Sequence, residues 1–224
     1  MLAIQQISTK VWAILGEKEE DVARAFIRFQ EFYENKDLRG HREITVRQVE
    51  EWWNVRRKEL DAEDDSYYQY WLGFNLPGKI IFELTRLPYF RSHYFQYNEE
   101  ETEMLFLLEK LTVDEINEGY FIGLWKDSED VLDHEVAHAY FTTIPAYKVE
   151  QLRNVAGLPK DIYEAIKHQL SELGYAPEVI NDEIQAYFST YPESLHETLD
   201  TNIYNSYTKP FVETFNKFHT TMPS

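Results

Sequence analysis

The run H-E-V-A-H at residues 134–138 places His134 and His138 four positions apart, with Glu135 between them. Residues at i and i+4 lie on the same face of an α-helix, so the two imidazoles can converge on one metal ion. Glu135 lies beside them and can act as a general base that takes a proton from a metal-activated water. A chain with seven histidines would contain this pattern by chance about once in forty cases, so its surroundings must add support.

A third ligand is expected downstream, because a catalytic zinc commonly has three protein ligands and one position left for water. Glu183 is the candidate, since it lies on a later predicted helix and Ala186 keeps one flank of that helix small. Tyr187 follows one turn later and can hydrogen-bond Glu183 or an oxyanion, although core packing is the alternative interpretation. The other candidates for the third ligand are Asp182, Glu178, Glu193, His168 and His196.

The composition narrows the chemistry further. The chain has no cysteine, so a metal must be held by His, Asp or Glu, and a His-His-Glu set favours zinc. The formal net charge of −18 disfavours nucleic acids and anionic membranes as partners, because both require a basic surface. It is typical instead of a soluble protein, or of one that prefers basic partners. No signal peptide and no long apolar segment are evident, so a cytoplasmic protein is expected.

The motif is predicted to lie on a helix from about residue 128 to 142, with Asp127 or Ser128 as its N-cap. The clearest predicted strand, residues 119–125, immediately precedes it. Pro and Gly residues then delimit the helices that should bring the third ligand to the site. These helices are predicted at residues 145–155, 159–173, 177–191 and 210–218.

The chain changes character near residue 75, which predicts a helical N-terminal extension (1–75) and a metal-binding domain (76–224). In the extension, apolar residues recur at helical spacing over 19–33 and 45–60, and Thr45 is a candidate N-cap. Its aromatic residues are interpreted as core rather than as a binding surface. In the second part, strands are predicted at 79–84 and 89–97, and 104–108 is compatible with either strand or helix.

From residue 119 onward the chain resembles the zincin superfamily, specifically its gluzincin branch. That branch carries H-E-x-x-H on one helix and a glutamate ligand on a later helix. The matching residues are His134, Glu135, His138 and Glu183, within the runs D-H-E-V-A-H-A-Y-F at 133–141 and D-E-I-Q-A-Y at 182–187. These runs are similar to uncharacterised bacterial zincin-like proteins.

The chain departs from two known patterns. Around the third ligand, Asp182 replaces the first residue of the thermolysin-like pattern N-E-x-x-S-D, and Ala186-Tyr187 replace its Ser-Asp pair. The acidic residue that would orient a ligand histidine is therefore not identified. The longer metzincin motif is not met either, because Phe141 and Ile144 occupy its Gly and His positions.

The resemblance implies an α+β, zincin-like fold. In this fold a small, twisted, mostly antiparallel sheet packs on the motif helix, and a helical C-terminal lobe supplies Glu183. It implies a zinc-dependent peptidase or hydrolase acting on a peptide or protein substrate. Residues 119–125 are placed near the edge of the sheet, where an extended peptide can add as a strand.

Two alternatives are kept open. The first is a catalytically inactive zincin-like protein that binds metal or a partner protein, which the missing orienting Asp favours. The second is a helical interaction protein with a chance motif, which the aromatic-rich N-terminal third favours.

Overall fold

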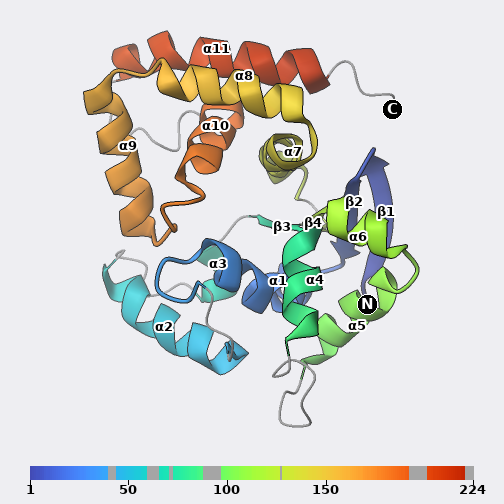
Figure 1. Ribbon diagram of the computed structural model, residues 1–224. Coiled ribbons are helices and arrows are strands. Elements are labelled where there is room, and N and C mark those ends of the chain that lie inside the picture. The colour runs from blue at the N-terminus through green and yellow to red at the C-terminus, as the bar shows by residue number, and fades with distance from the viewer. Residues whose placement is uncertain are drawn as a thin grey trace. The chain divides into compact units, whose positions relative to one another are not determined.

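The computed structural model describes residues 1–39, 44–59, 66–70, 73–87, 97–126, 128–191 and 201–219 (Figure 1). The chain forms two compact units, Met1–Leu132 and Asp133–Ser224. This division differs from the boundary predicted near residue 75. The predicted α+β class is confirmed, because helices accompany a four-stranded sheet.

The sheet lies in the first unit and has the strand order β1-β2-β4-β3. β1 (Ala3–Ser8) pairs antiparallel with β2 (Val11–Gly16), and β2 pairs in parallel with β4 (Tyr120–Trp125). β3 (Phe74–Pro77) pairs antiparallel with β4. Two of the three pairings are thus antiparallel, in a mixed sheet. Packing of this sheet on the motif helix stays a prediction.

The hairpin of β1 and β2 corrects the helical prediction for the first residues of the chain. Lys10 makes the turn between the strands with a φ of 64°, in the left-handed region. Val11, Ala13 and Ile14 are all buried, so β2 shows none of the polar alternation that marks a half-buried strand. A fully buried strand and a short helical segment cannot be told apart by periodicity alone.

β4 confirms the strand predicted over 119–125, but its position in the sheet differs from the expected one. It is flanked by β2 on one side and by β3 on the other. The placement of this segment near a sheet edge that could accept a substrate peptide was therefore wrong. Gly123 on β4 allows α1 (Glu19–Glu34) to approach closely, because a Cβ there would lie 2.5 Å from Cγ1 of Val22.

Two further predictions in the first unit are settled by its helices. Residues 79–84 form a helix, α4 (Gly78–Arg86), not a strand, because the buried residues Gly78, Ile81 and Leu84 recur at three-residue spacing. Residues 104–108 belong to α5 (Glu99–Leu108), which settles the choice in favour of helix. Of the strand predicted at 89–97, residues 89–96 lie outside the described residues.

The predicted N-cap of α2 (Val46–Glu59) is confirmed. The Thr45 hydroxyl accepts from the main-chain N–H of Gln48 at 3.2 Å, and the Gln48 side chain accepts from the Thr45 N–H at 2.8 Å. Within the nearby aromatic group, Trp53 and Tyr67 are buried in the core as predicted. The short helices α3 (Tyr67–Tyr70) and α6 (Val113–Glu118) complete the unit.

The helices of the second unit follow the prediction closely. α7 (Glu129–Thr143) spans the boundary between the units, and α8 (Pro145–Ala156) and α9 (Lys160–Leu173) follow it. Gly174 ends α9 with a φ of 108°. Asp127 lies outside the described residues, and the Ser128 hydroxyl donates to the carbonyl of Trp125 at 2.7 Å, within the preceding turn.

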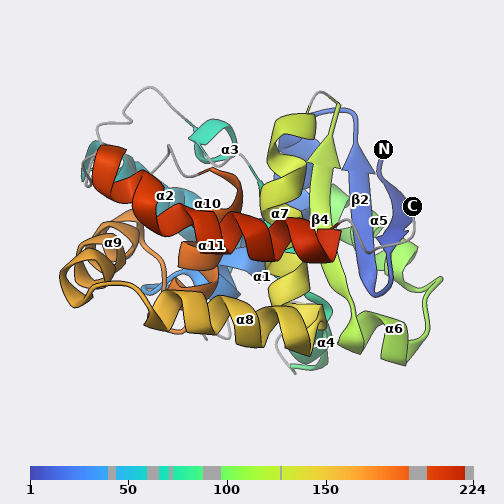
Figure 2. The same ribbon diagram turned by 90° about the horizontal axis from the view of Figure 1, so that it is seen from above.

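Two helices complete the second unit and its apolar core. α10 (Ile180–Thr190) shares that core with α8 and α9. α11 (Thr201–His219) is longer than the predicted 210–218 and contains Pro210 within it. α8 and α11 lie side by side and run in opposite directions (Figures 1 and 2). The core of this unit is therefore built from helices alone among the described residues.

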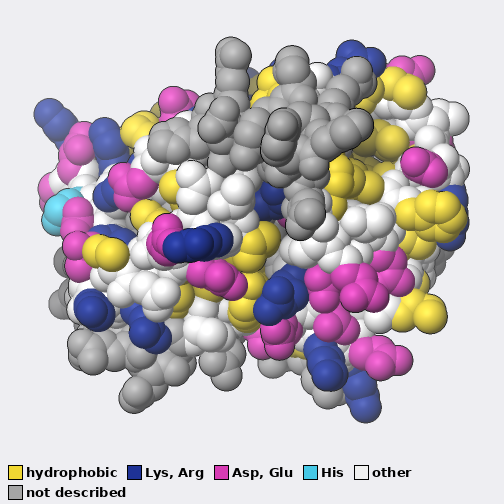
Figure 3. Space-filling model, turned by 90° about the horizontal axis from the view of Figure 1, so that it is seen from below, with side chains coloured by type: hydrophobic (Ala, Val, Ile, Leu, Met, Phe, Trp, Pro, Cys, Tyr) yellow, Lys and Arg dark blue, Asp and Glu magenta, His cyan; other side chains and the backbone are white. Residues whose placement is uncertain are grey.

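The surface reflects the acidic composition. Asp and Glu side chains are spread over the face in Figure 3, interspersed with Lys and Arg. Within the described residues, no helix combines the length and apolarity needed to cross a membrane.

Candidate metal centre

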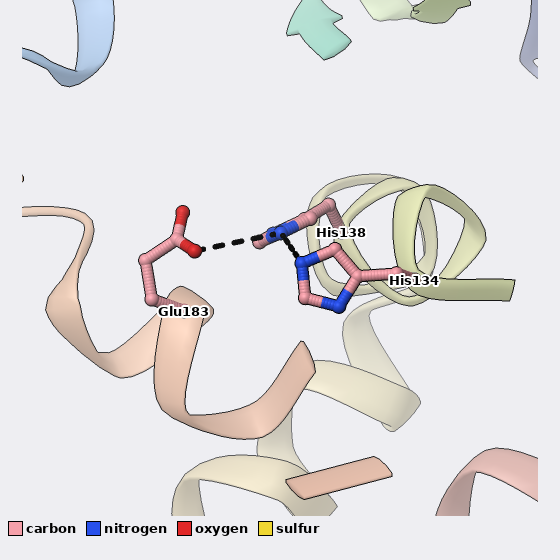
Figure 4. A group of neighbouring side chains, drawn as sticks. All are labelled: His134, His138 and Glu183. Carbon is pink, nitrogen blue, oxygen red and sulfur yellow. Dashed lines mark hydrogen bonds and ion pairs between the residues drawn. The ribbon is translucent and has the colours of Figure 1, made fainter. Parts of the chain in front are cut away.

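α7 and α10 bring together the three predicted ligands. His134 and His138 lie one turn apart on α7, and Glu183 faces them from the first turn of α10 (Figure 4). The Nε2 atoms of the two histidines are 3.3 Å apart, and Oε2 of Glu183 lies 3.8 Å from Nε2 of His138. One ligand atom from each residue lies within 4.8 Å of the others, so the group could hold a metal ion.

Each histidine is oriented through its other ring nitrogen. Nδ1 of His138 lies 2.9 Å from Oδ1 of Asp182, and a carboxylate can only accept there. Nδ1 of His134 lies 3.1 Å from the hydroxyl of Thr190, which donates its own proton to the carbonyl of Ala186 at 2.8 Å. Both Nδ1 atoms therefore carry the proton, and both Nε2 lone pairs point into the space between the ligands.

Glu183 adds a third acceptor to that space. Its Oε2 is buried and has no hydrogen-bond partner, while Tyr175 donates a hydrogen bond to its carboxylate. When neither Nε2 atom carries a proton, these two nitrogens and Oε2 are three acceptors that face one another. A buried polar atom without a partner is destabilising, and a cation satisfies all three at once.

The spacing suits a tetrahedral ion. Ligands about 2.05 Å from zinc in a tetrahedron lie about 3.3 Å from one another. The two histidine nitrogens already have this separation, and the carboxylate oxygen at 3.8 Å from His138 is close to it. All three ligand atoms lie within 4.8 Å of one another, so Glu183 would have to move closer to the histidines to complete a tetrahedral set.

The pKa values of the site reflect an excess of buried negative charge. Burial alone lowers the pKa of His138, but the carboxylates of Glu183, Asp182 and Glu135 together raise it well above its ordinary value. Burial raises the pKa of Glu183 as well. Burial and the charge on His138 lower the pKa of His134. Without a metal, a proton between the two Nε2 atoms supplies the missing positive charge.

The two predicted catalytic residues lie close to the ligands. Glu135 is buried, and its charge raises the pKa of both His138 and Glu183, so it lies near these two side chains. The ring of Tyr187 packs against that of His134, with 4.8 Å between their centres. The packing interpretation of Tyr187 thus has direct support, and its hydrogen bond to Glu183 stays a prediction.

None of the described alternatives for the third ligand belongs to the group of converging ligand atoms. His168 and Glu178 are outside the ligand group, and Glu193 and His196 lie outside the described residues. Asp182 contacts His138 through Nδ1, on the side of the ring away from the ligand atom. It therefore orients a predicted ligand, which is the role that the sequence left unassigned.

Thr190 and Tyr175 also contact the predicted ligands and were not among the residues predicted from the sequence. Thr190 follows Glu183 by seven positions, so both lie on one face of α10, and that spacing was a usable signal. Tyr175 carried no such signal, because it follows the left-handed Gly174 in a turn between helices. Its direction depends on the geometry of that turn.

Comparison of the chain with protein-family models, with curated proteins and with solved structures found no match. The resemblance to gluzincins stays a prediction, and support for the metal centre comes from its geometry.

Proposed function

We propose that this chain binds one zinc ion through Nε2 of His134, Nε2 of His138 and a carboxylate oxygen of Glu183. The observation that carries this proposal is the convergence of two histidine Nε2 atoms and a carboxylate oxygen, all within 4.8 Å of one another. Hydrogen bonds at Nδ1 direct both histidine lone pairs inward, as is usual for ligand histidines. A His-His-Glu set is typical of zinc among the common divalent ions.

We further propose a hydrolase of the gluzincin type that acts on peptide bonds. A bound zinc supplies a Lewis acid that polarises the substrate carbonyl and lowers the pKa of water. Glu135 follows His134 directly on α7 and is held beside the ligands. Its carboxylate accepts a proton from the attacking water and passes it to the leaving amine.

A second candidate function is metal binding without peptidase activity. It is favoured by the burial of the site, because His138, Glu135 and Glu183 are each only 3 % exposed. Structural zinc sites are closed, whereas catalytic sites keep one position open to solvent and substrate.

Metal content tests the site itself. Elemental mass spectrometry of the full chain should find about one zinc per chain, lost or much weakened in His134→Ala, His138→Ala and Glu183→Ala. His168→Ala on α9 and Glu178→Ala are matched controls, because both lie outside the ligand group, and they should retain zinc. A wild-type chain that takes up no zinc when it is supplied would exclude the proposed site.

Hydrolysis of a mixed peptide library separates the two candidate functions. The hydrolase predicts cleavage that a chelator abolishes and that Glu135→Gln loses while zinc content stays at the wild-type level. Zinc binding without cleavage of any peptide would favour the second candidate. Cleavage that persists in Glu135→Gln would exclude the base role of Glu135.

A further inference from the structure

A chain of buried hydrogen bonds begins at Asp182 and leads away from the metal centre. Gln185, fully buried on α10, donates from Nε2 to Oδ1 of Asp182 at 2.9 Å and to the carbonyl of Ala137 at 3.3 Å. Both acceptors lack a proton to give, so the amide can be oriented in one way only. Gln185 therefore ties α10 to α7, the two helices that carry the ligands.

The next links are set by the same reasoning. Because both N–H groups of Gln185 face Asp182 and Ala137, its Oε1 must accept, and it does so from the Tyr147 hydroxyl at 2.7 Å. Tyr147 on α8 thereby uses its only proton, so its oxygen accepts from Nε2 of Gln151 at 3.0 Å. Burial raises the pKa of Tyr147, which keeps that proton in place.

The last links reach α11. Nε2 of Gln151 also lies 3.1 Å from Oγ of Ser189 and 3.3 Å from the carbonyl of Phe211 on α11. Asn154, one turn further along α8, donates to the carbonyl of Pro210 at 3.2 Å. From Gln151 through Tyr147 and Gln185 to Asp182, each side chain donates its hydrogen bond to the next one. Gln151, Tyr147 and Gln185 are fully buried.

We propose that Gln185 and Tyr147 are positioning residues of the metal centre: they hold Asp182 so that His138 presents Nε2 to the metal. The proposal rests on the proposed zinc site. Neither residue is among the ligands, and Tyr147 acts through two intermediate side chains, Gln185 and Asp182. Removing one of these hydrogen bonds leaves buried polar groups without a partner. Their rearrangement displaces Asp182 and, with it, the ring of His138.

Tyr147→Phe is the sharpest variant, because it removes one oxygen and keeps the ring contacts with Tyr140 and Phe218. Tyr163→Phe is the matched control. The Tyr163 hydroxyl donates to Oδ1 of Asn181 at 3.2 Å. Asn181 directly precedes Asp182 in the sequence but is not part of the chain of hydrogen bonds. Gln185→Met removes the link next to Asp182 at similar side-chain volume.

The experiment measures Zn²⁺ affinity of the full chain by competition with a chelator, and the visible absorption of the Co²⁺-substituted protein. We expect affinity to fall about 10- to 100-fold in Gln185→Met and about 3- to 10-fold in Tyr147→Phe, with altered Co²⁺ bands, and to stay within about twofold of wild type in Tyr163→Phe. Circular dichroism and unfolding curves without metal confirm that each variant is folded.

The outcomes separate this inference from the proposed function. If the wild type binds Zn²⁺ and Tyr147→Phe binds it equally well with an unchanged Co²⁺ spectrum, the positioning role is overturned and the zinc site stands. If Tyr163→Phe weakens binding as much as Tyr147→Phe does, the effect is a general loss of helix packing and the inference again fails. A wild type that binds no metal overturns both.

Discussion

Each unit of this protein buries a carboxylate completely, and the two carboxylates have different partners. In the first unit, Glu101 faces the guanidinium of Arg28 with both oxygens, and the two side chains are 0 % and 2 % exposed. In the second unit, Glu183 is 3 % exposed, and its ion-pair partner among the described residues is His138. Asp182 shares that same histidine.

The difference shows what each site is suited to do. Arg28 and Glu101 balance each other in charge, and Glu101 also accepts from the main-chain N–H of Asn98 at 3.0 Å to complete the capping box of α5. Around His138, by contrast, three carboxyl groups, those of Glu183, Asp182 and Glu135, raise the pKa of a single imidazole. A balanced pair holds structure in place, whereas a buried excess of negative charge is a place for a cation.

The largest effect is expected from breaking the balanced pair. Arg28→Met leaves Glu101 buried without its counter-ion, and we expect it to lower the free energy of unfolding by about 3–5 kcal/mol in urea denaturation. Arg28→Met combined with Glu101→Leu should recover most of the loss, because both charges are then gone. An additive loss in the double variant would contradict this account.

Glu31 supplies an intermediate case, because it is buried with hydrogen bonds from the neutral groups of Tyr67 and Asn35. Burial raises its pKa from 4.5 to about 7. Between these values the unfolded chain has released the proton and the folded chain still holds it. Stability should therefore fall as pH rises from about 4.5 to about 7, by about 3 kcal/mol from this residue.

Glu31→Gln tests this expectation, because it removes the titrating group and keeps its size. The variant should flatten the pH dependence and be more stable than wild type at pH 8. Chemical denaturation at several pH values measures both. An unchanged slope between pH 4.5 and 7 would assign the dependence to other groups.

Neutralising one carboxylate at each site should change the free energy of unfolding by a smaller amount. The change should have opposite signs at the two sites. With a chelator present, Glu183→Gln should stabilise the protein at neutral pH by about 1–2 kcal/mol, because burial raises the pKa of Glu183 to about 8 and disfavours the ionised carboxylate that the unfolded chain carries. Glu101→Gln should destabilise it, since Arg28 then lacks a counter-ion. Destabilisation by both variants would show that the charge at Glu183 is already balanced without metal.

The sequence predicted the second unit well because its signals are local. Pro145 and Gly174 lie at helix ends, and the predicted helices around them are confirmed. The convergence of His134, His138 and Glu183 was also predictable, since it needs only one helix face and a later helix bearing a carboxylate.

The remainder depends on tertiary packing. The β1–β2 hairpin was missed because the burial of β2 comes from its neighbours in the sheet and leaves no periodic pattern. At the site, the role of Asp182 depends on how α10 is rotated against α7. A residue next to a ligand in sequence is turned about 100° away from it on a helix, so spacing alone did not reveal its contact with His138.

The smallest expected effect concerns the residues that hold the Nδ1 proton of each histidine. Thr190 fixes the tautomer of His134 with a neutral hydroxyl, whereas Asp182 fixes that of His138 with a charge. Thr190→Val should therefore lower Zn²⁺ affinity only about 2- to 10-fold, less than Asp182→Asn does, and Thr190→Ser should bind as wild type because it keeps the hydroxyl. Chelator competition measures all three. Equal affinities of the Val and Ser variants would show that His134 needs no hydrogen-bond partner at Nδ1. The metal itself would then have to orient the Nε2 lone pair of His134.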